Sequence, residues 1–240
     1  MSTKLLSVVE WVRPYVSNLF MLNDATLEPA MTNANILLGT ILGPPFVWEW
    51  NRNATTFTCT AGTTDYTGSV GDFGYLEEAS LQVPTTAPND AGTIYQLSNS
   101  RTLSPSSQPG RPAFISINND DLNGNITFRL GSSNPDQAYI LEVTYQQALV
   151  PITSVSALIP MPDKLVHIFK YGFLAMSFLY AQDSRFNEMN QKFIATLLGS
   201  QSGLDNLQKN IFLGQWLSAL GEEGAVALSN QQGYQARGAS

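Results

Sequence analysis

The order of hydrophobic patterns along the chain constrains its fold more than any other feature. Apolar residues recur at helical spacing near the start of the chain, alternate with polar residues through its middle, and return to helical spacing after Pro151. A zone of strands framed by helical zones is an insertion, and the two helical ends can then bury their apolar faces against each other. The pattern predicts an α+β fold, in which a helical bundle formed by the N- and C-terminal segments carries an inserted antiparallel β-sandwich or barrel domain.

The predicted boundaries follow the same changes of pattern. Residues 1–53 and 151–221 are assigned to the helical bundle, residues 54–150 to the β-domain, and residues 222–240 to a flexible C-terminal tail. The tail is rich in Gly, Ala and Gln and shows no periodicity, so it has no apolar face of its own to bury. We expect it to become ordered only on a partner.

The longest apolar stripe follows Met161-Pro162-Asp163, where a helix is predicted to begin. One face of this helix consists of large apolar residues at helical spacing: Leu165, Phe169, Phe173, Met176 and Tyr180. A second face carries Ile168, Ala175 and Leu179. A helix that is apolar on two faces is buried between neighbours.

The middle zone reads as short strands. Ile126, Phe128 and Leu130 alternate with polar residues, and so do the apolar residues of the segment 139–145. Asn123-Gly124 stands between two such runs and favours a tight hairpin. Short strands separated by frequent turn residues indicate a small sandwich or barrel.

The charge content limits the function classes. Charged residues make up 13% of the chain and the formal net charge is -7, whereas an average soluble protein has roughly 25% charged residues. Because charged residues are depleted at interface cores, so few of them suggest a surface that is largely covered. An acidic balance argues against general nucleic-acid binding, which needs clusters of Lys and Arg, and fits a surface that DNA passes without sticking.

Candidate catalytic groups are few, and each has a simpler structural interpretation. The single histidine, His167, is predicted on a helix face, and the single cysteine, Cys59, is predicted to be a small buried strand residue. Asp72, Glu77 and Glu78 have the spacing of a solvated strand edge. We therefore expect no catalytic residue, no cofactor and no metal, and no apolar run is long enough for a membrane span.

Several passages, taken in order, resemble the head-to-tail adaptors of tailed bacteriophages of the short-tailed type, also called gatekeeper or tail tubular protein A. The resemblance covers roughly residues 20 to 200 and rests on five passages: residues 35–53 with Trp48-Glu49-Trp50-Asn51, residues 62–66, 72–77, 135–139 and 159–163. The order of these motifs along the chain carries the resemblance. The larger β-domain and the last helix with its tail depart from the smaller adaptors.

The resemblance implies a structural virion protein of the neck or tail, assembled in the host bacterial cytoplasm. It implies a ring, usually dodecameric, that bridges the portal protein and the tail nozzle or next tail component and lines a channel for double-stranded DNA without sequence specificity. The expected subunit interface is the large apolar stripe of residues 165–180. By analogy with the family, the expected portal contacts lie in the last helix and tail: Leu213, Trp216, Leu217, Leu220, Tyr234 and Arg237.

Two other functions remain open on the sequence. The chain could be a different phage part, such as a stopper, a tail-completion protein or a baseplate component. It could also be a carbohydrate- or receptor-binding module in which Tyr66, Tyr75 and Tyr95 stack on sugars, although strand tyrosines usually pack in a core or at an edge.

Overall fold

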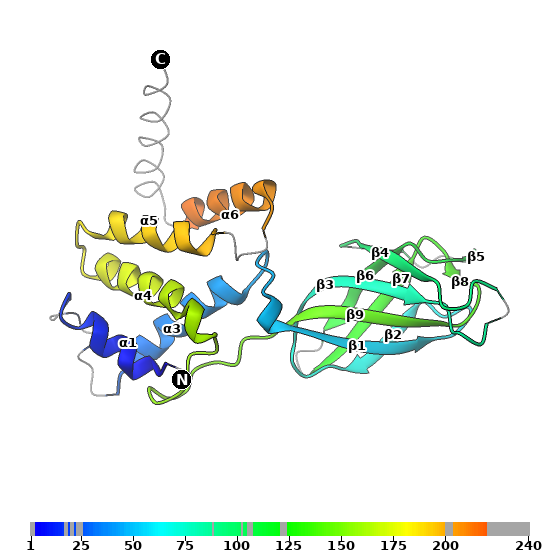
Figure 1. The fold of residues 1–240 in the computed structure, drawn as a ribbon, viewed down its shortest axis with the longest axis horizontal. Coiled ribbons are helices and arrows are strands. Elements are labelled where there is room, and N and C mark those ends of the chain that lie inside the picture. Colours follow the sequence, from blue (N-terminus) through cyan, green and yellow to red (C-terminus); the bar gives the residue numbers. More distant parts are fainter. Residues whose placement is uncertain are drawn as a thin grey trace, which may run out of the picture. The chain divides into compact units, whose positions relative to one another are not determined.

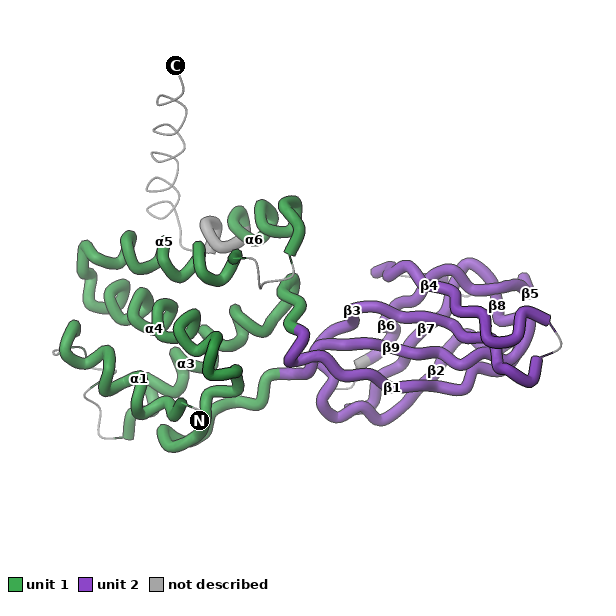
Figure 2. Tube along the Cα trace, viewed as in Figure 1, with its two compact units in different colours: residues 1–48, 149–240 green, residues 49–148 purple. Residues whose placement is uncertain are grey.

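The computed structural model describes residues 3–16, 19, 22, 26–87, 89–101, 103–104, 108–120, 124–199 and 204–219. The chain divides into two compact units, which are coloured separately in Figure 2. The first, here called the helical unit, consists of Met1–Trp48 and Leu149–Ser240, and the second, the β-unit, consists of Glu49–Ala148. Within the described residues, the fold is α+β.

Five α-helices of the helical unit are described: α1 (Leu5–Val12), α3 (Glu28–Leu42), α4 (Val166–Tyr180), α5 (Phe186–Leu197) and α6 (Asn206–Ala219). Helix α4 contacts α1, α3 and α5, and Figure 1 shows it between α5 on one side and α1 and α3 on the other. Gly172 allows this close approach, because a Cβ there would lie 2.6 Å from Leu37 Cδ1 of α3 and 2.9 Å from Phe193 Cε2 of α5.

The helix predicted to begin at Met161-Pro162-Asp163 starts within a few residues of that point, and local contacts also mark both ends of α3. The Thr26 hydroxyl accepts a hydrogen bond from the Glu28 amide at 3.3 Å, and α3 ends before Gly43. A short 3-10 turn (Asp163–Leu165) precedes α4. The two-faced apolar pattern of residues 165–180 has its predicted consequence, since nine of the fifteen residues of α4 are buried.

Backbone hydrogen bonds join the start of α1 to the segment that follows the β-unit. The Leu5 and Leu6 amides donate to the carbonyls of Ala157 and Val155 at 3.1 and 2.9 Å. Asn35 of α3 clamps the same returning segment, because its side chain donates to the Ile152 carbonyl at 3.0 Å and accepts from the Ile152 amide at 2.7 Å. The segment that follows the β-unit is thereby tied to helices that precede it.

The described residues of the β-unit form nine strands, seven of them in one sheet with the order β1-β9-β3-β4-β6-β7-β2. The seven are β1 (Arg52–Cys59), β2 (Asp65–Ser69), β3 (Phe73–Gln82), β4 (Ile94–Asn99), β6 (Phe114–Asp120), β7 (Asn125–Gly131) and β9 (Tyr139–Gln147). Strands β5 (Pro109–Gly110) and β8 (Asn134–Pro135) form a short separate pair.

The seven-stranded sheet is nearly closed and barrel-like. Its end strands β1 and β2 lie against each other, and the Phe57 ring occupies the space that a side chain at Gly68 would need. Inward residues fill the interior as the alternation predicted: Ile126, Phe128 and Leu130 are buried, and so are the odd-numbered residues from Tyr139 to Tyr145.

One part of the strand prediction needs correction. The sheet is not purely antiparallel, because β4 pairs with β6 in parallel through Ser98 and Asn99, and β5 pairs with β8 in parallel. The chain between β4 and β6 is too long for a tight hairpin, so β6 can return in the same direction as β4. The predicted hairpin after β6 is present as the antiparallel pair β6–β7, although Asn123 itself lies outside the described residues.

Candidate assembly surfaces

The stripe expected to form the subunit interface lies mostly inside the helical unit. Leu165 is nearly buried, and Phe169 and Phe173 have no exposed surface at all, with their rings 5.9 Å apart. The packing of these three residues holds α4 against the rest of the unit, and their role in a subunit interface stays a prediction.

The remaining two residues of the stripe lie at the surface end of α4. Met176 is half-buried and Tyr180 is 53% exposed, next to Leu179 at 42%. The exposed part of the stripe is thus confined to the last turns of α4, where it lies beside Leu179 from the second apolar face.

A hollow of about 80 Å³ opens between α4 and α5 beside these residues. Its lining is apolar except for one carboxamide, and consists of Gly172, Ala175, Met176, Leu179, Phe186, Asn190 and Phe193. Gly172 helps to form the hollow, because it leaves bare backbone on α4 where α5 passes. The sequence pattern identified the α4 side of this surface but not the contribution of α5.

Of the residues expected to contact the portal, Leu213 is described and lies half-buried on α6. Trp216 and Leu217 belong to the same helix, but their side chains lie outside what the structure describes, as do Leu220, Tyr234 and Arg237 altogether. Helix α6 is held in the unit by Phe212, whose ring meets Phe46 edge-on at 4.7 Å. These six residues stay a prediction.

Sequence reasoning missed a separate apolar face of α6. Leu207 is 68% exposed and Ile211 is 50% exposed, and residues four apart lie on one side of a helix. The four-residue spacing of Leu207 and Ile211 could have indicated this face. The contacts expected on this helix begin instead at Leu213, which lies on another side of it.

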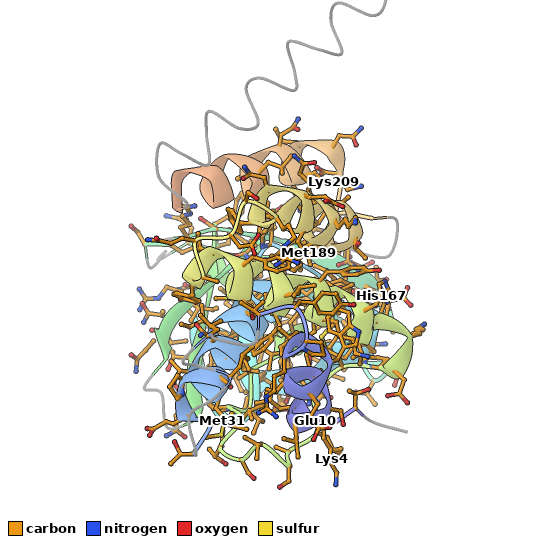
Figure 3. All side chains as sticks on the ribbon, turned by 90° about the vertical axis from the view of Figure 1, so that its left-hand side faces the viewer. Lys4, Glu10, Met31, His167, Met189 and Lys209 are labelled. Atoms are coloured by element: carbon orange, nitrogen blue, oxygen red, sulfur yellow. The ribbon has the colours of Figure 1, made fainter. Side chains whose placement is uncertain are left out.

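Cys59 and His167 belong to different units of the chain. Cys59 is fully buried in the β-unit, where burial raises the pKa of its thiol to about 11, so it is a thiol at neutral pH. His167 belongs to the helical unit, where its ring meets that of Tyr171 edge-on at 6.3 Å. In Figure 3 the labelled Lys209, Met189 and His167 follow one another from α6 through α5 to α4.

Asp72 is a structural acceptor. Its carboxylate accepts hydrogen bonds from Gln147 and Tyr145, each at 2.7 Å, and from Asn53 at 3.0 Å. The bond from Gln147, followed by those from Tyr145 and Asn53, holds the pKa of Asp72 below its ordinary value. The carboxylate joins β1 and β9 to the start of β3.

Glu77 also has a structural role, because it binds side chains of β1 and β9. It forms an ion pair with Arg52 and accepts a hydrogen bond from the buried Gln146 side chain at 2.7 Å. The bond with Glu77 raises the pKa of Arg52. Glu78 is exposed, so the three carboxylates do not converge on one site.

The tyrosines considered for sugar stacking do not form an open platform. Tyr66 is buried, and its hydroxyl donates to the carbonyls of Thr60, at 3.1 Å, and Thr63. The Tyr75 hydroxyl is buried, and the Tyr95 ring is covered by the Arg111 guanidinium at 4.1 Å. The described surface of the β-unit therefore gives no support to a carbohydrate site built on these rings.

Two further searches concern only the described residues. No three His, Cys, Asp or Glu side chains among them gather closely enough to hold a metal ion. No helix in the described part of the chain is both long and apolar enough to cross a membrane.

Comparison with known families gives one match. The family described as SU10 adaptor protein matches residues 23–213, which is most of the chain and includes residues of both units. This chain belongs to the SU10 adaptor family. No curated protein matches the chain.

Membership of the SU10 adaptor family supports the expectation of a bacteriophage adaptor, a structural protein of the virion neck. The match begins before α3 and ends within α6, so the β-unit lies inside the SU10 adaptor region. The uncovered apolar residues of α4 and α6 are the surfaces in this SU10 adaptor that best fit an assembling protein, because large exposed apolar groups indicate contact with a partner.

Proposed function

We propose that this chain forms a ring, dodecameric as in the gatekeeper or tail tubular protein A type of short-tailed phages, between the portal protein and the tail. The observation that carries the proposal is the SU10 adaptor match across residues 23–213. The helical unit would supply the contacts between neighbouring subunits and line the DNA channel. The β-unit would face outward or meet the tail nozzle or next tail component.

The distribution of charge supports this division of roles. The β-unit contains four basic and ten acidic residues, whereas the helical unit contains eight basic and nine acidic residues. Nearly all of the net charge of -7 therefore belongs to the β-unit. An acidic unit of this kind repels DNA phosphates and favours a protein partner whose facing surface is basic.

The apolar residues at the end of α4 support subunit contacts in the helical unit. Leu179 and Tyr180 together expose apolar surface beside the hollow, and burying such surface contributes about 25 cal/mol per Å². Residues 213–237 would bind the portal, and where the tail orders on it the new contacts must exceed the cost of that ordering.

The experiment is to measure the mass of the purified full-length protein by native mass spectrometry, first alone and then mixed with phage portal complexes. We expect a stoichiometric ring on the portal. Truncation after residue 212 should abolish this binding while leaving the β-unit folded, because it removes every expected portal contact.

A protein that neither multimerises nor binds the portal would contradict the proposal. Recovery of the same protein at the distal end of the tail would instead assign it to another tail component, such as a baseplate part. A truncated chain that still binds the portal would leave the ring proposal intact and would refute the role of residues 213–237.

A further inference from the structure

Asn190 lines the hollow between α4 and α5, and the described residues offer no hydrogen-bond donor to its buried side-chain oxygen. Asn190 is only 5% exposed, and its Oδ1 accepts no hydrogen bond from any residue that the structure describes. Leaving such an atom unsatisfied destabilises a protein, so an acceptor in this position indicates a missing donor. The other six residues that line the hollow are apolar or glycine.

The hollow has the size and chemistry of a receptor for an aliphatic side chain. A volume of about 80 Å³ exceeds the roughly 10–15 Å³ that one water needs. None of its described lining residues is charged, so an apolar group can enter without desolvating an ion. The best occupant is an apolar side chain that stands next to a hydrogen-bond donor.

Helix α6 offers this combination on its exposed face. Leu207, Asn210, Ile211 and Gly214 are all exposed and share one side of the helix by their spacing. The face thus carries two aliphatic side chains, one carboxamide that can donate, and a glycine around which another helix can approach closely. No charged residue occurs among these four.

The two surfaces match, but they do not meet within one chain. Phe212 fixes the opposite side of α6 against Phe46, which leaves Leu207 and Ile211 in solvent, while the hollow is open on α4 and α5. Two complementary surfaces on different sides of one subunit are what a head-to-tail ring needs, because each copy then offers one surface to each neighbour.

We infer that the face of α6 formed by Leu207, Asn210, Ile211 and Gly214 docks into the α4–α5 hollow of a second copy of this chain. Ile211 or Leu207 fills the hollow, and the Asn210 carboxamide donates to Asn190 Oδ1 of that copy. The inference deepens the proposed ring and rests on it. It assigns the ring contact to a side of α6 other than the one that carries Leu213, which stays available to the portal.

The test is disulfide crosslinking of the full chain with the pair Leu179→Cys and Ile211→Cys, one residue from each surface. The native chain contributes no competing accessible thiol, because Cys59 is fully buried. The matched control pairs Leu179→Cys with Ile36→Cys, since Ile36 is an exposed helical isoleucine of the same unit at 54%. Both variants are oxidised as purified protein over a range of concentrations and in assembled necks.

We expect a ladder of covalent multimers from the α6 pair and no ladder from the control pair. Ile211→Glu should lower the multimer fraction at least tenfold, whereas Ile36→Glu should leave it unchanged. A covalently closed monomer would overturn the inference, because α6 would then cover the hollow of its own chain. A ring detected by its mass but without this crosslink would also overturn it and leave the proposed function standing. Absence of both the crosslink and any multimer would refute both.

Discussion

At the scale of single residues, Asp72 connects the two strands at which the chain enters and leaves the β-unit. Its three donors come from β1 and β9, which pair with each other from Arg52 to Cys59. A charged acceptor with several donors contributes more than a neutral one. The sequence indicated an acidic strand edge here, but it could not reveal that residues 19 and 75 positions away in the chain donate to the same carboxylate.

Asp72→Asn should destabilise the β-unit at neutral pH by about 1.5–3 kcal/mol, because an amide cannot accept from all three donors. The folded-state pKa of Asp72 lies below its ordinary value, so its stabilisation is present above the ordinary value and is lost as the pH falls through the lowered one. Urea unfolding at several pH values measures this.

The control for Asp72 is Glu142→Gln, which neutralises an exposed carboxylate of β9 for which the structure shows no hydrogen bond. The difference in unfolding free energy between wild type and Asp72→Asn should shrink in acid. A difference that stays constant down to acid pH would mean that the charge of Asp72 contributes nothing.

Gly172 gives a second prediction at this scale. Gly172→Ala should lower the stability of the helical unit by about 1–2 kcal/mol, because overpacking against Leu37 and Phe193 exceeds the gain in helix propensity. Gly39→Ala in α3 should raise it by up to about 1 kcal/mol, since a Cβ there meets no atom within 4 Å. Equal shifts of the two urea midpoints would contradict the packing argument.

At the scale of elements, α4 shows what a hydrophobic pattern can predict about a helix and what it cannot. The sequence predicted its position and its two apolar faces correctly, because helical spacing is a local property. The same spacing cannot distinguish a face covered by the chain itself from one covered by another subunit. Phe169 and Phe173 therefore seemed suited to an interface, and only the tertiary packing shows that they lie in the core.

This difference along α4 is measurable. Phe173→Ala should destabilise the helical unit by about 3–5 kcal/mol, because it leaves a cavity in a fully buried site. Tyr180→Ala, at a position that is largely exposed, should change stability by no more than about 0.5–1 kcal/mol. The fluorescence of buried Trp48 can follow the unfolding, and similar losses for both variants would refute the assignment of Phe173 to the core.

The pairing of strand β4 is a second feature that the sequence pattern did not predict. Alternation predicted the strands β7 and β9, and turn residues predicted the hairpin β6–β7, because its two strands are close in sequence. The parallel pairing of β4 with β6 depends on where the intervening segment carries the chain. No local pattern records that path.

At the scale of the whole molecule, the β-unit has the properties of a self-sufficient insertion. Its own buried cluster includes Phe128, Leu141 and Tyr145, and its two ends meet where Asn51 donates to the Gln147 carbonyl at 3.1 Å. We predict that residues 49–148 expressed alone unfold cooperatively in urea, with a native-like circular dichroism spectrum. A noncooperative transition would show that the β-unit needs the helical unit to fold.

The Asn35 clamp has a consequence for the order of events during synthesis. Helices α1 and α3 leave the ribosome before the whole β-unit, whereas Ile152 and α4, their packing partners, follow it. At roughly 5–20 residues per second, the apolar sides of these early helices wait about 5–20 s for their partners. Once the β-unit has folded, residues 51 and 147 are hydrogen-bonded to each other. The segment with Ile152 and α4 then begins close to the end of the segment with α1 and α3. The inserted unit thus shortens the search that completes the helical unit.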